Sequence, residues 1–356
     1  MRAVRIHGER DLRVEDLPDP VLGPGMVVLS GGFTGICGTD IHLYYAPSSY
    51  GADFSQPAAL TGAVWPQILG HEFSGVVTEV GPQVTNVRLG DRVAVFPYHS
   101  CGVCWPCRAG QETDCELMAF DGIQGRSGGL AERKLIAADQ CFLLPDGVDL
   151  ELGALVEPMA VGWHGVEVAR VAQGSSALIV GGGPIGIGVF FALRARGVWP
   201  ILVSEASDTR REVLRRVGVE MLIDPFAEDL FSRVMAMTSG AGVTSVIDTA
   251  GSPQAFVDAM RCLAVRGSMV TIAIYERPIP LTRSLLATGR SIRSSAVYTR
   301  DDFRAVIDAM AEGSISLQGD WVRCIDVDDI DLAIADLRAG AGPKVLVRTP
   351  DADHPT

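Results

Sequence analysis

The chain has 356 residues, 47 % hydrophobic and 21 % charged, a composition typical of a folded protein with a large core and about two domains. A formal net charge of −13 argues against binding to a nucleic-acid backbone, which requires clustered lysine and arginine. The N-terminus shows no secretory signal, and the one long uncharged run, 173–193, holds too many glycines for a membrane helix. We therefore expect a cytoplasmic protein whose eight cysteines are metal ligands or free thiols rather than disulfides.

The first third of the chain carries two segments of reactive side chains within a β-rich pattern. GICGTDIH at 35–42 places a thiol, a hydroxyl, a carboxylate and an imidazole within six residues. LGHEFSGVV at 69–77 sets a His71–Glu72 pair at the start of a strand. Cys37 alone is compatible with a buried structural thiol, but together with a histidine it forms a partial zinc shell.

The sharpest local pattern is a group of four cysteines, Cys101, Cys104, Cys107 and Cys115. The two-residue gaps let a loop wrap a metal ion, and four thiolates close a tetrahedral zinc site. Because no coordination position remains for a substrate, this site is expected to be structural. A nucleic-acid zinc ribbon is the rival interpretation, but the segment carries a single arginine and no lysine to form a basic face.

Glu157 stands in a strongly apolar stretch just ahead of a predicted helix at 159–172. A surface or capping carboxylate is one interpretation of this position. A buried carboxylate normally needs a partner or a metal, so Glu157 is also a candidate third ligand beside Cys37 and His71.

From residue 175 onward predicted strands and helices alternate, which indicates a parallel doubly wound sheet. The predicted strands are 176–180, 200–204, 221–223, 244–248 and 268–274, and the predicted helices are 184–196, 208–217, 226–238 and 253–264. Later helices are predicted at 301–312 and 328–339, with a last strand at 344–348.

The first of these strands runs into a glycine-rich turn with the spacing Gly181-x-Gly183-x-x-Gly186, followed by a helix. Backbone N–H groups at such a helix start can bind the pyrophosphate of a dinucleotide. The second strand ends in Glu205, about 20 residues on, where an acid that binds the adenosine ribose is expected.

In this order the segments, with GDRV at 90–93 and VEPMAV at 156–161, resemble the zinc-dependent medium-chain alcohol dehydrogenases over nearly the whole chain. Within that family the sequence looks most like the (R,R)-2,3-butanediol dehydrogenase branch, and sorbitol dehydrogenases are close rivals. The resemblance implies an α/β protein with a Rossmann, doubly wound cofactor domain and a β-rich GroES-like catalytic domain. The implied limits are 1–158 for the catalytic domain with a structural zinc lobe at about 97–118, 159–295 for the NAD-binding domain, and 296–356 for a C-terminal segment that returns to the catalytic domain.

The resemblance also implies roles for single residues. Cys37, His71 and Glu157 match the catalytic zinc shell, Glu72 the acid that approaches the metal transiently, and Asp40 the carboxylate that hydrogen-bonds the ligand histidine. Thr39 matches the hydroxyl that passes the alcohol proton toward His42. The four cysteines match the structural zinc ligands. Cofactor binding is implied for Gly181, Gly183, Pro184, Ile185, Gly186, Glu205 and Arg210.

Together these features imply two zinc ions per subunit and hydride transfer between NAD(H) and a secondary alcohol or ketone, with 2,3-butanediol and acetoin as the nearest substrates. A carboxylate at Glu205 favours NAD because it repels a 2′-phosphate. Arg210 and Arg211 could pair such a phosphate, but they more simply face solvent on a helix.

Several alternatives remain open at this point. Sorbitol-like polyols and L-threonine are other substrates that the resemblance allows. A non-catalytic nucleotide-binding relative, or a zinc-free quinone reductase, is disfavoured because the residues of both metal sets are present. The loop at 43–66 is expected to supply Tyr44, Tyr50 and Trp65 to the substrate pocket, and a homodimer or homotetramer is expected to form through the cofactor domain.

Overall fold

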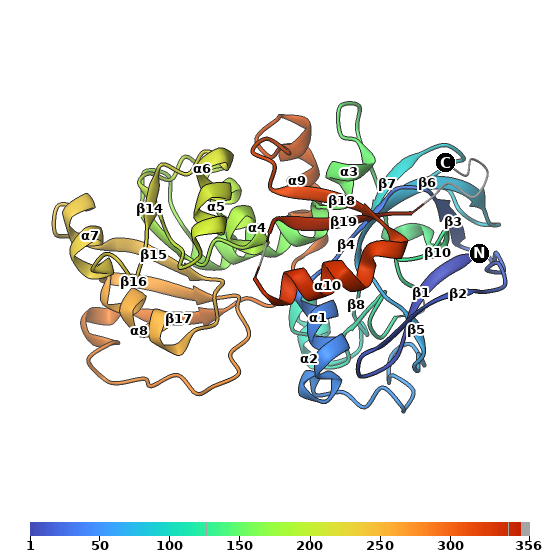
Figure 1. The fold of residues 1–356 in the computed structure, drawn as a ribbon, viewed down its shortest axis with the longest axis horizontal. Coiled ribbons are helices and arrows are strands. Elements are labelled where there is room, and N and C mark those ends of the chain that lie inside the picture. The colour runs from blue at the N-terminus through green and yellow to red at the C-terminus, as the bar shows by residue number, and fades with distance from the viewer. Residues whose placement is uncertain (126, 341, 350–356) are drawn as a thin grey trace. The chain divides into compact units, whose positions relative to one another are not determined.

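The computed structural model describes residues 1–125, 127–340 and 342–349, and its contacts divide the chain into two compact units. The first unit contains Met1–Glu157 and Val322–Thr356, and the second contains Pro158–Trp321 (Figure 1). Residues 296–321 thus group with the second unit, whereas the sequence analysis expected them in the C-terminal segment. The physical reason is packing of a helix in this stretch, because His164 Nδ1 of one helix lies 2.8 Å from Asp302 Oδ2 of another.

The second unit is built on a parallel six-stranded sheet in the order β14-β13-β12-β15-β16-β17. Its strands are β12 (Ala177–Val180), β13 (Ile201–Ser204), β14 (Met221–Ile223), β15 (Val243–Asp248), β16 (Leu263–Thr271) and β17 (Ser291–Ser294). Its helices are α4 (Val156–Ala169), which begins just before the unit boundary, α5 (Pro184–Ala195), α6 (Asp208–Val217), α7 (Leu230–Met237), α8 (Pro253–Arg261), η4 (Ala287–Gly289) and α9 (Arg300–Ala311). The strand order reverses between β12 and β15, the position at which doubly wound sheets bind ligands.

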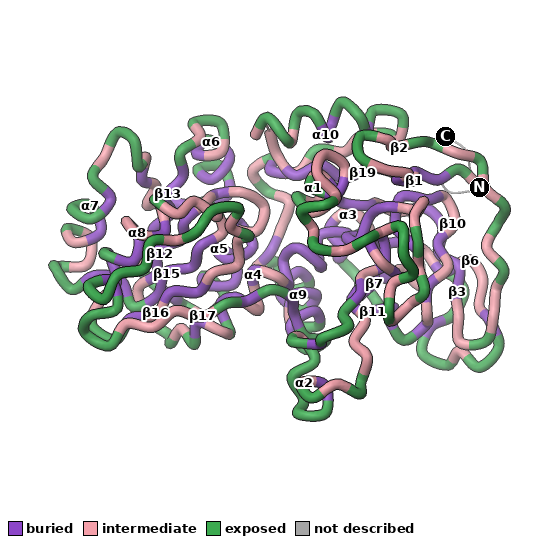
Figure 2. The backbone as a smooth tube through the Cα atoms, turned by 90° about the horizontal axis from the view of Figure 1, so that it is seen from below, coloured by how far each residue is buried: buried purple, intermediate pink, exposed green. Residues whose placement is uncertain are grey.

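Strands and helices of this unit follow from their composition. All four residues of β12 and of β13 are buried, as expected for parallel strands covered on both faces (Figure 2). Helix α6 begins at Ser207, whose Oγ accepts the Arg210 N–H at 3.4 Å, and ends at Gly218, whose φ of 100° suits a left-handed cap.

The first unit is mainly antiparallel, in three sheets. A three-stranded sheet has the order β2-β1-β5, and a two-stranded sheet pairs β8 with β9. The largest runs β10-β3-β6-β4-β19-β18, with β7 paired to β6 and β11 paired to β7. The strands are β1 (Arg2–Gly8), β2 (Asp11–Asp16), β3 (Met26–Ser30), β4 (Phe33–Gly35), β5 (Gln67–Ile68), β6 (Glu72–Val80), β7 (Arg92–Val95), β8 (Tyr98–His99), β9 (Ala119–Phe120), β10 (Arg133–Ala137), β11 (Cys141–Leu143), β18 (Val322–Asp326) and β19 (Lys344–Arg348).

Short helices connect these strands. They are α1 (Gly38–Tyr45), η1 (Pro47–Tyr50), α2 (Trp105–Arg108), η2 (Glu112–Asp114), η3 (Ala138–Gln140), α3 (Leu150–Gly153), η5 (Val327–Asp329) and α10 (Ile330–Arg338). Helix α10 and β19 pack on the core of this unit, where Ile334 and Val345 join Val4, Ile36 and Leu69 in one buried cluster. In the described part of the chain no helix is both long enough and apolar enough to span a bilayer.

The sequence contains only two lysines, Lys134 in β10 and Lys344 at the start of β19, and both are buried. Lys134 Nζ donates to Gly31 O at 2.8 Å and to Thr349 Oγ1 at 2.9 Å. Lys344 Nζ donates to Ile36 O at 2.8 Å. The two ammonium groups therefore fasten the last strand to the chain on either side of β4.

Candidate metal and dinucleotide sites

A group of three ligand-type side chains lies inside the first unit. Among the described residues, the ligand atoms of Cys37, His71 and Glu72 all lie within 4.8 Å of one another. Cys37 is the N-cap of α1, and His71 and Glu72 stand at the start of β6, which pairs with β4. The fold thus brings together residues from two separate segments of the sequence.

Asp40 supports this group from the first turn of α1. Its Oδ2 accepts the Cys37 N–H at 2.8 Å, and its Oδ1 lies 3.6 Å from His71 Nδ1, an ion-pair distance rather than a hydrogen bond. Burial lowers the pKa of His71, but the nearby Asp40 and Cys37 anions outweigh burial and raise it well above its ordinary value. Burial also raises the pKa of Asp40.

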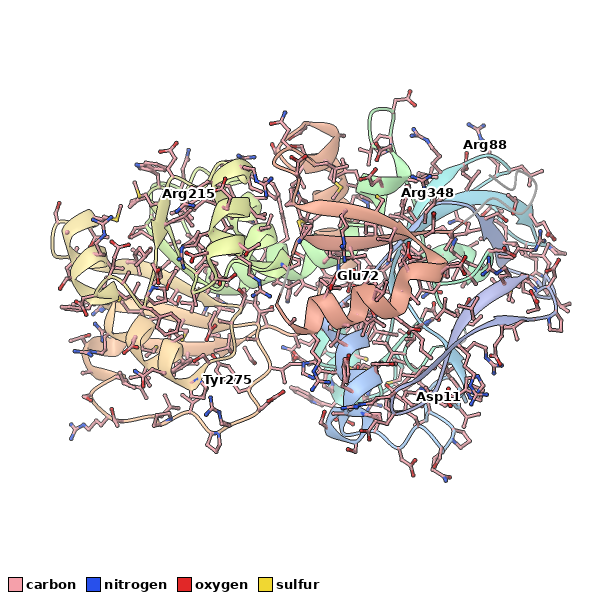
Figure 3. All side chains as sticks on the ribbon, in the orientation of Figure 1. Asp11, Glu72, Arg88, Arg215, Tyr275 and Arg348 are labelled. Atoms are coloured by element: carbon pink, nitrogen blue, oxygen red, sulfur yellow. The ribbon has the colours of Figure 1, made fainter. Side chains whose placement is uncertain are left out.

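Glu72 is paired with a residue that the sequence analysis missed. Its carboxylate forms a fully buried ion pair with Lys344 of β19. Figure 3 labels Glu72 among the side chains of the structure. The pKa of Lys344 is raised despite burial, which acts to lower it, because Glu72 and Cys37 favour the charged ammonium. A glycine at position 35 is needed for this arrangement, since a Cβ there would lie 2.0 Å from Glu72 Oε2. The sequence signal that could have found Lys344 is its place as a lysine at the start of the apolar strand 344–348.

The remaining residues expected at the catalytic metal lie around the same group. Thr39 Oγ1 is 3.8 Å from Cys37 Sγ, and His42 is exposed on the same helix. Glu157 is buried and acts electrostatically on both His71 and Lys344, although it is outside the 4.8 Å group. The geometry therefore puts two carboxylates, those of Glu72 and Glu157, near Cys37 and His71.

The residues present fit a soft divalent cation. A thiol, an imidazole and a carboxylate form the donor set that zinc prefers, with a fourth position open in catalytic sites. Buried His71 Nδ1 and Asp40 Oδ1 have no hydrogen-bond partner among the described residues, so the local charge is incompletely compensated. A cation held by this group would supply Lewis-acid polarisation of an alcohol or carbonyl oxygen.

The four clustered cysteines are also assembled. The sulfurs of Cys101, Cys104, Cys107 and Cys115 all lie within 4.8 Å of one another. Cys101 Sγ is 4.0 Å from Cys107 Sγ, and Cys104 Sγ is 4.0 Å from Cys115 Sγ. Zinc–sulfur bonds of about 2.3 Å in a tetrahedron put sulfurs about 3.8 Å apart, so these distances fit one ion.

Backbone N–H groups further favour the thiolate of Cys101, whereas burial raises the pKa of Cys107 to about 12. The Val103 and Cys104 N–H groups point at Cys101 Sγ at 3.4 and 3.3 Å, and they lower the pKa of Cys101 to about 6. The Cys101 N–H is 3.2 Å from Cys115 Sγ. All eight cysteines of the chain are free of disulfides.

In the second unit each glycine of the turn has a distinct role. Gly181 has a φ of 95°, which favours glycine, and a Cβ at Gly186 would lie 2.1 Å from Gly181 O. A Cβ at Gly183, the N-cap of α5, would meet no atom within 4 Å. The space beside Gly183 is thus open at a helix start where Pro184 and Ile185 form the first turn, as an anion site requires.

Glu205 is joined directly to this turn. Its Oε2 accepts the Gly182 N–H at 2.6 Å, and its Oε1 accepts the Ser207 N–H at 2.7 Å. The residue is buried at the end of β13, beside the point where the strand order reverses. Each carboxylate oxygen retains a lone pair for a further donor such as a ribose hydroxyl.

The expectation that Arg211 faces solvent is wrong. Arg211 is buried, and its Nη1 donates to Glu205 O at 2.6 Å and to Ala206 O at 2.8 Å. Its Nη2 pairs with Asp224 Oδ2 at 2.8 Å and also with Asp208. This guanidinium therefore holds the Glu205 loop, and Arg210, which is half-buried, is the neighbouring cation left near it.

The loop 43–66 forms an aromatic wall, and only part of it faces the metal cluster. The rings of Phe54 and Trp65 stack at 4.4 Å, and Tyr50 packs on Phe54 at 5.8 Å. Burial and then Asp331 raise the pKa of Tyr44, so Tyr44 lies in a different environment from Cys37.

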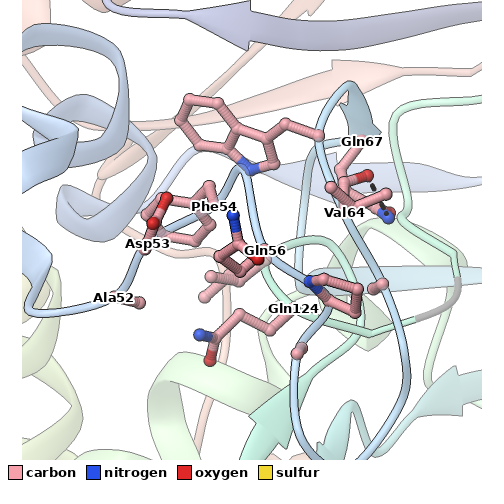
Figure 4. Close-up of a pocket in the computed structure, with 12 residues that line it drawn as sticks. Ala52, Asp53, Phe54, Gln56, Val64, Gln67 and Gln124 are labelled. Carbon is pink, nitrogen blue, oxygen red and sulfur yellow. Dashed lines mark hydrogen bonds between the residues drawn. The ribbon is translucent and has the colours of Figure 1, made fainter.

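A cavity of about 230 Å³ lies against this wall, and Phe54 and Trp65 are part of its lining (Figure 4). It is lined by polar and aromatic side chains, including Asp53, Phe54, Gln56, Trp65 and Gln124. The loop therefore encloses a space large enough for a small polar molecule.

Two family models match the chain. The first, alcohol dehydrogenase GroES-like domain, matches residues 23–146, and the second, zinc-binding dehydrogenase, matches residues 184–312. Three relatives align along most of the chain. The (R,R)-butanediol dehydrogenase of Bacillus subtilis is 33 % identical and covers 93 % of the chain and 94 % of its own length. A Saccharomyces cerevisiae protein named probable diacetyl reductase [(R)-acetoin forming] 2 is 33 % identical, with 89 % and 81 % covered. A probable D-xylulose reductase A of Aspergillus clavatus is 29 % identical, with 96 % and 95 % covered.

Solved structures agree with these matches. The crystal structure of 2R,3R-butanediol dehydrogenase from Bacillus subtilis superposes with a TM-score of 0.89 at 32 % identity, covering 98 % of this chain and 99 % of that one. A Sinorhizobium meliloti protein bound to NADP gives 0.86 at 29 % identity, with 97 % and 98 % covered. An alcohol dehydrogenase from Escherichia coli CFT073 bound to NADH gives 0.85 at 25 % identity, with 98 % of each chain covered.

Proposed function

Because the chain belongs to the zinc-binding alcohol dehydrogenases, a family of oxidoreductases, we propose that it interconverts 2,3-butanediol and acetoin with NAD(H). The observation that carries this proposal is the group of half-buried Cys37 with buried His71 and Glu72, in a chain that also has the dinucleotide turn. The butanediol and diacetyl enzymes among its relatives support the choice of substrate.

We assign roles to the residues around the metal as follows. Cys37 and His71 hold the ion, and a carboxylate completes its protein ligands. Glu157 would be the third ligand, and Glu72, which is paired with Lys344, would stand beside the ion. Asp40 orients the His71 ring. Thr39 accepts the proton of the alcohol and passes it toward His42, whose exposed ring releases it to solvent. Hydride transfer further requires the nicotinamide of a bound dinucleotide to reach this group.

We propose NAD as the preferred dinucleotide. Glu205 is buried and held by two N–H groups, so a 2′-phosphate would meet a fixed negative charge. Arg211 is engaged by Asp224 and the backbone, which leaves Arg210 as the neighbouring cation able to pair a phosphate. The pyrophosphate is assigned to Gly181, Gly183, Pro184, Ile185 and Gly186.

The test combines metal analysis with a substrate panel. We expect about two zinc ions per chain and NAD-linked oxidation of a 2,3-butanediol stereoisomer faster than that of sorbitol, threonine or ethanol. Cys37→Ala should abolish turnover and leave NAD binding largely intact, whereas Cys324→Ala, a half-buried thiol outside both clusters, is the matched control. Oxidation of sorbitol-type polyols alone would refute the butanediol assignment.

A second candidate is a polyol dehydrogenase, favoured by the D-xylulose reductase relative. The same panel separates the two, because a polyol enzyme would oxidise xylitol or sorbitol faster than butanediol. We further propose a cytoplasmic homodimer or homotetramer, to be tested by light scattering of the purified protein.

A further inference from the structure

Tyr50 is the last residue of a short helix in the loop 43–66. It ends η1, which packs back on α1, and α1 begins at Cys37. Its ring is partly buried against the core cluster that contains Ile36 and Leu43, and it packs on Phe54. The ring is thus fixed on both sides, which limits the positions its hydroxyl can take.

The hydroxyl of Tyr50 makes no hydrogen bond to the described residues, and it is not among their fully buried polar atoms, so it is open to a ligand. Burial raises the pKa of Tyr50 to about 12, and the charges of Cys37 and Asp40 add to this effect. The phenol is therefore protonated under ordinary conditions and stands within electrostatic reach of the cluster. A neutral phenol in this position can donate one hydrogen bond to a ligand oxygen.

A vicinal diol or hydroxyketone carries one acceptor that a simple secondary alcohol lacks. When its reacting carbon is at the metal cluster, the oxygen on the neighbouring carbon needs a partner, because an unpaired polar group in a closed site is costly. An ionised carboxylate of the cluster can accept the proton of that hydroxyl but cannot donate to its lone pairs, so a donor to the oxygen must come from another side chain.

We propose that the Tyr50 hydroxyl donates a hydrogen bond to the second oxygen of a vicinal diol or α-hydroxyketone and so selects this substrate class. The inference rests on the proposed function, since it assumes that the Cys37 cluster is the reacting site. It makes Tyr50 a determinant of specificity and leaves the residues of proton transfer unchanged.

The test compares 2,3-butanediol with 2-butanol in the zinc-loaded enzyme. For Tyr50→Phe we expect kcat/KM with NAD to fall about tenfold for the diol, the value of one neutral hydrogen bond, and to stay within about twofold for 2-butanol. Tyr45→Phe is the matched control, because the Tyr45 ring is held between the guanidinium groups of Arg10 and Arg338.

A binding measurement without turnover accompanies the kinetics. Both alcohols are titrated into the enzyme–NADH complex, which cannot react with them, and binding is followed by NADH fluorescence. We expect Tyr50→Phe to weaken diol binding about tenfold and to leave 2-butanol binding unchanged. Equal losses for the two alcohols, or no loss for the diol in an active enzyme, would overturn the role of Tyr50. A wild-type enzyme that oxidises neither alcohol would instead refute the proposed function.

Discussion

Lys134 should be largely neutral in the folded protein at mildly alkaline pH. Burial lowers its pKa from 10.5 to about 7, and its Nζ contacts are a carbonyl and a hydroxyl. A difference of this size between folded and unfolded chains corresponds to about 5 kcal/mol.

The direction in which stability changes with pH follows from the number of protons that the folded and unfolded chains bind. Between pH 7 and 10.5 the unfolded chain keeps a proton on Lys134 that the folded chain has lost, so stability rises with pH. The slope is about 1.2 kcal/mol per pH unit near pH 8 to 9. The full free-energy cost of burying the Lys134 ammonium applies below pH 7, and this cost disappears above pH 10.5. Lys134→Met should remove this slope, and it should also lower the baseline because Gly31 O loses its donor.

The chain offers a direct assay because it has two lysines. Labelling lysine with ¹³C at Cε should give two NMR signals, and Lys134→Met should leave one. We expect one signal to titrate near pH 7, while that of Lys344, whose pKa is raised, stays charged beyond 10.5. A Lys134 signal unchanged up to pH 9.5 would refute the reasoning, and would mean that a carbonyl and a hydroxyl suffice to hold a buried ammonium.

Four further predictions concern the sites. Gly186→Ala should destabilise the protein by about 1–3 kcal/mol in urea unfolding, because its Cβ meets a backbone carbonyl. Gly183→Ala should keep wild-type stability yet weaken NAD binding at least tenfold by calorimetry, and unchanged affinity would mean that no phosphate approaches there. Cys104→Ala should lower the thermal midpoint and remove about one zinc ion per chain, and an unaltered midpoint would speak against a structural ion. Gly35→Ala should displace the Glu72 carboxylate, to be seen as lost activity in a folded enzyme, and full activity would contradict the crowding described.

Capping residues and other local sequence patterns predicted many of the helix and strand limits. The cap at Ser207 and the glycine at 218 are sequence-local, and the helix 208–217 and the strands 221–223 and 344–348 were predicted to the residue. Helix α7 begins at 230 rather than 226 because Asp229 accepts the Ser232 N–H at 2.8 Å.

The strand β16 shows the limit of the same reasoning. It begins at Leu263, whereas the sequence favoured a helix to 264 and a strand at 268–274. Pairing with β15 supplies the difference, since Val243 pairs with Leu263 across an irregular register. Such pairing depends on a partner elsewhere in the chain, which propensity cannot report.

In the candidate site, too, some features follow from local sequence and others depend on contacts between distant segments. Cysteine spacing is local, and the four sulfurs lie within 4.8 Å of one another. Whether Glu72 or Glu157 lies nearer to Cys37 depends on how β6 and α4 are placed, and the pairing of Glu72 with Lys344 joins distant segments. Arg211 was misjudged for the same reason, because its partner Asp224 follows the next strand.

The bond between Glu205 and the Gly182 N–H has a consequence for redesign and for divergence of this enzyme. The acid proposed to select the dinucleotide also fixes the turn that holds it. Replacing Glu205 with serine to admit a 2′-phosphate would leave the turn without its acceptor, so both cofactors would be bound more weakly at first. A route to NADP therefore needs a second change that restores an acceptor for that N–H, and preference in this chain should shift by paired rather than single substitutions.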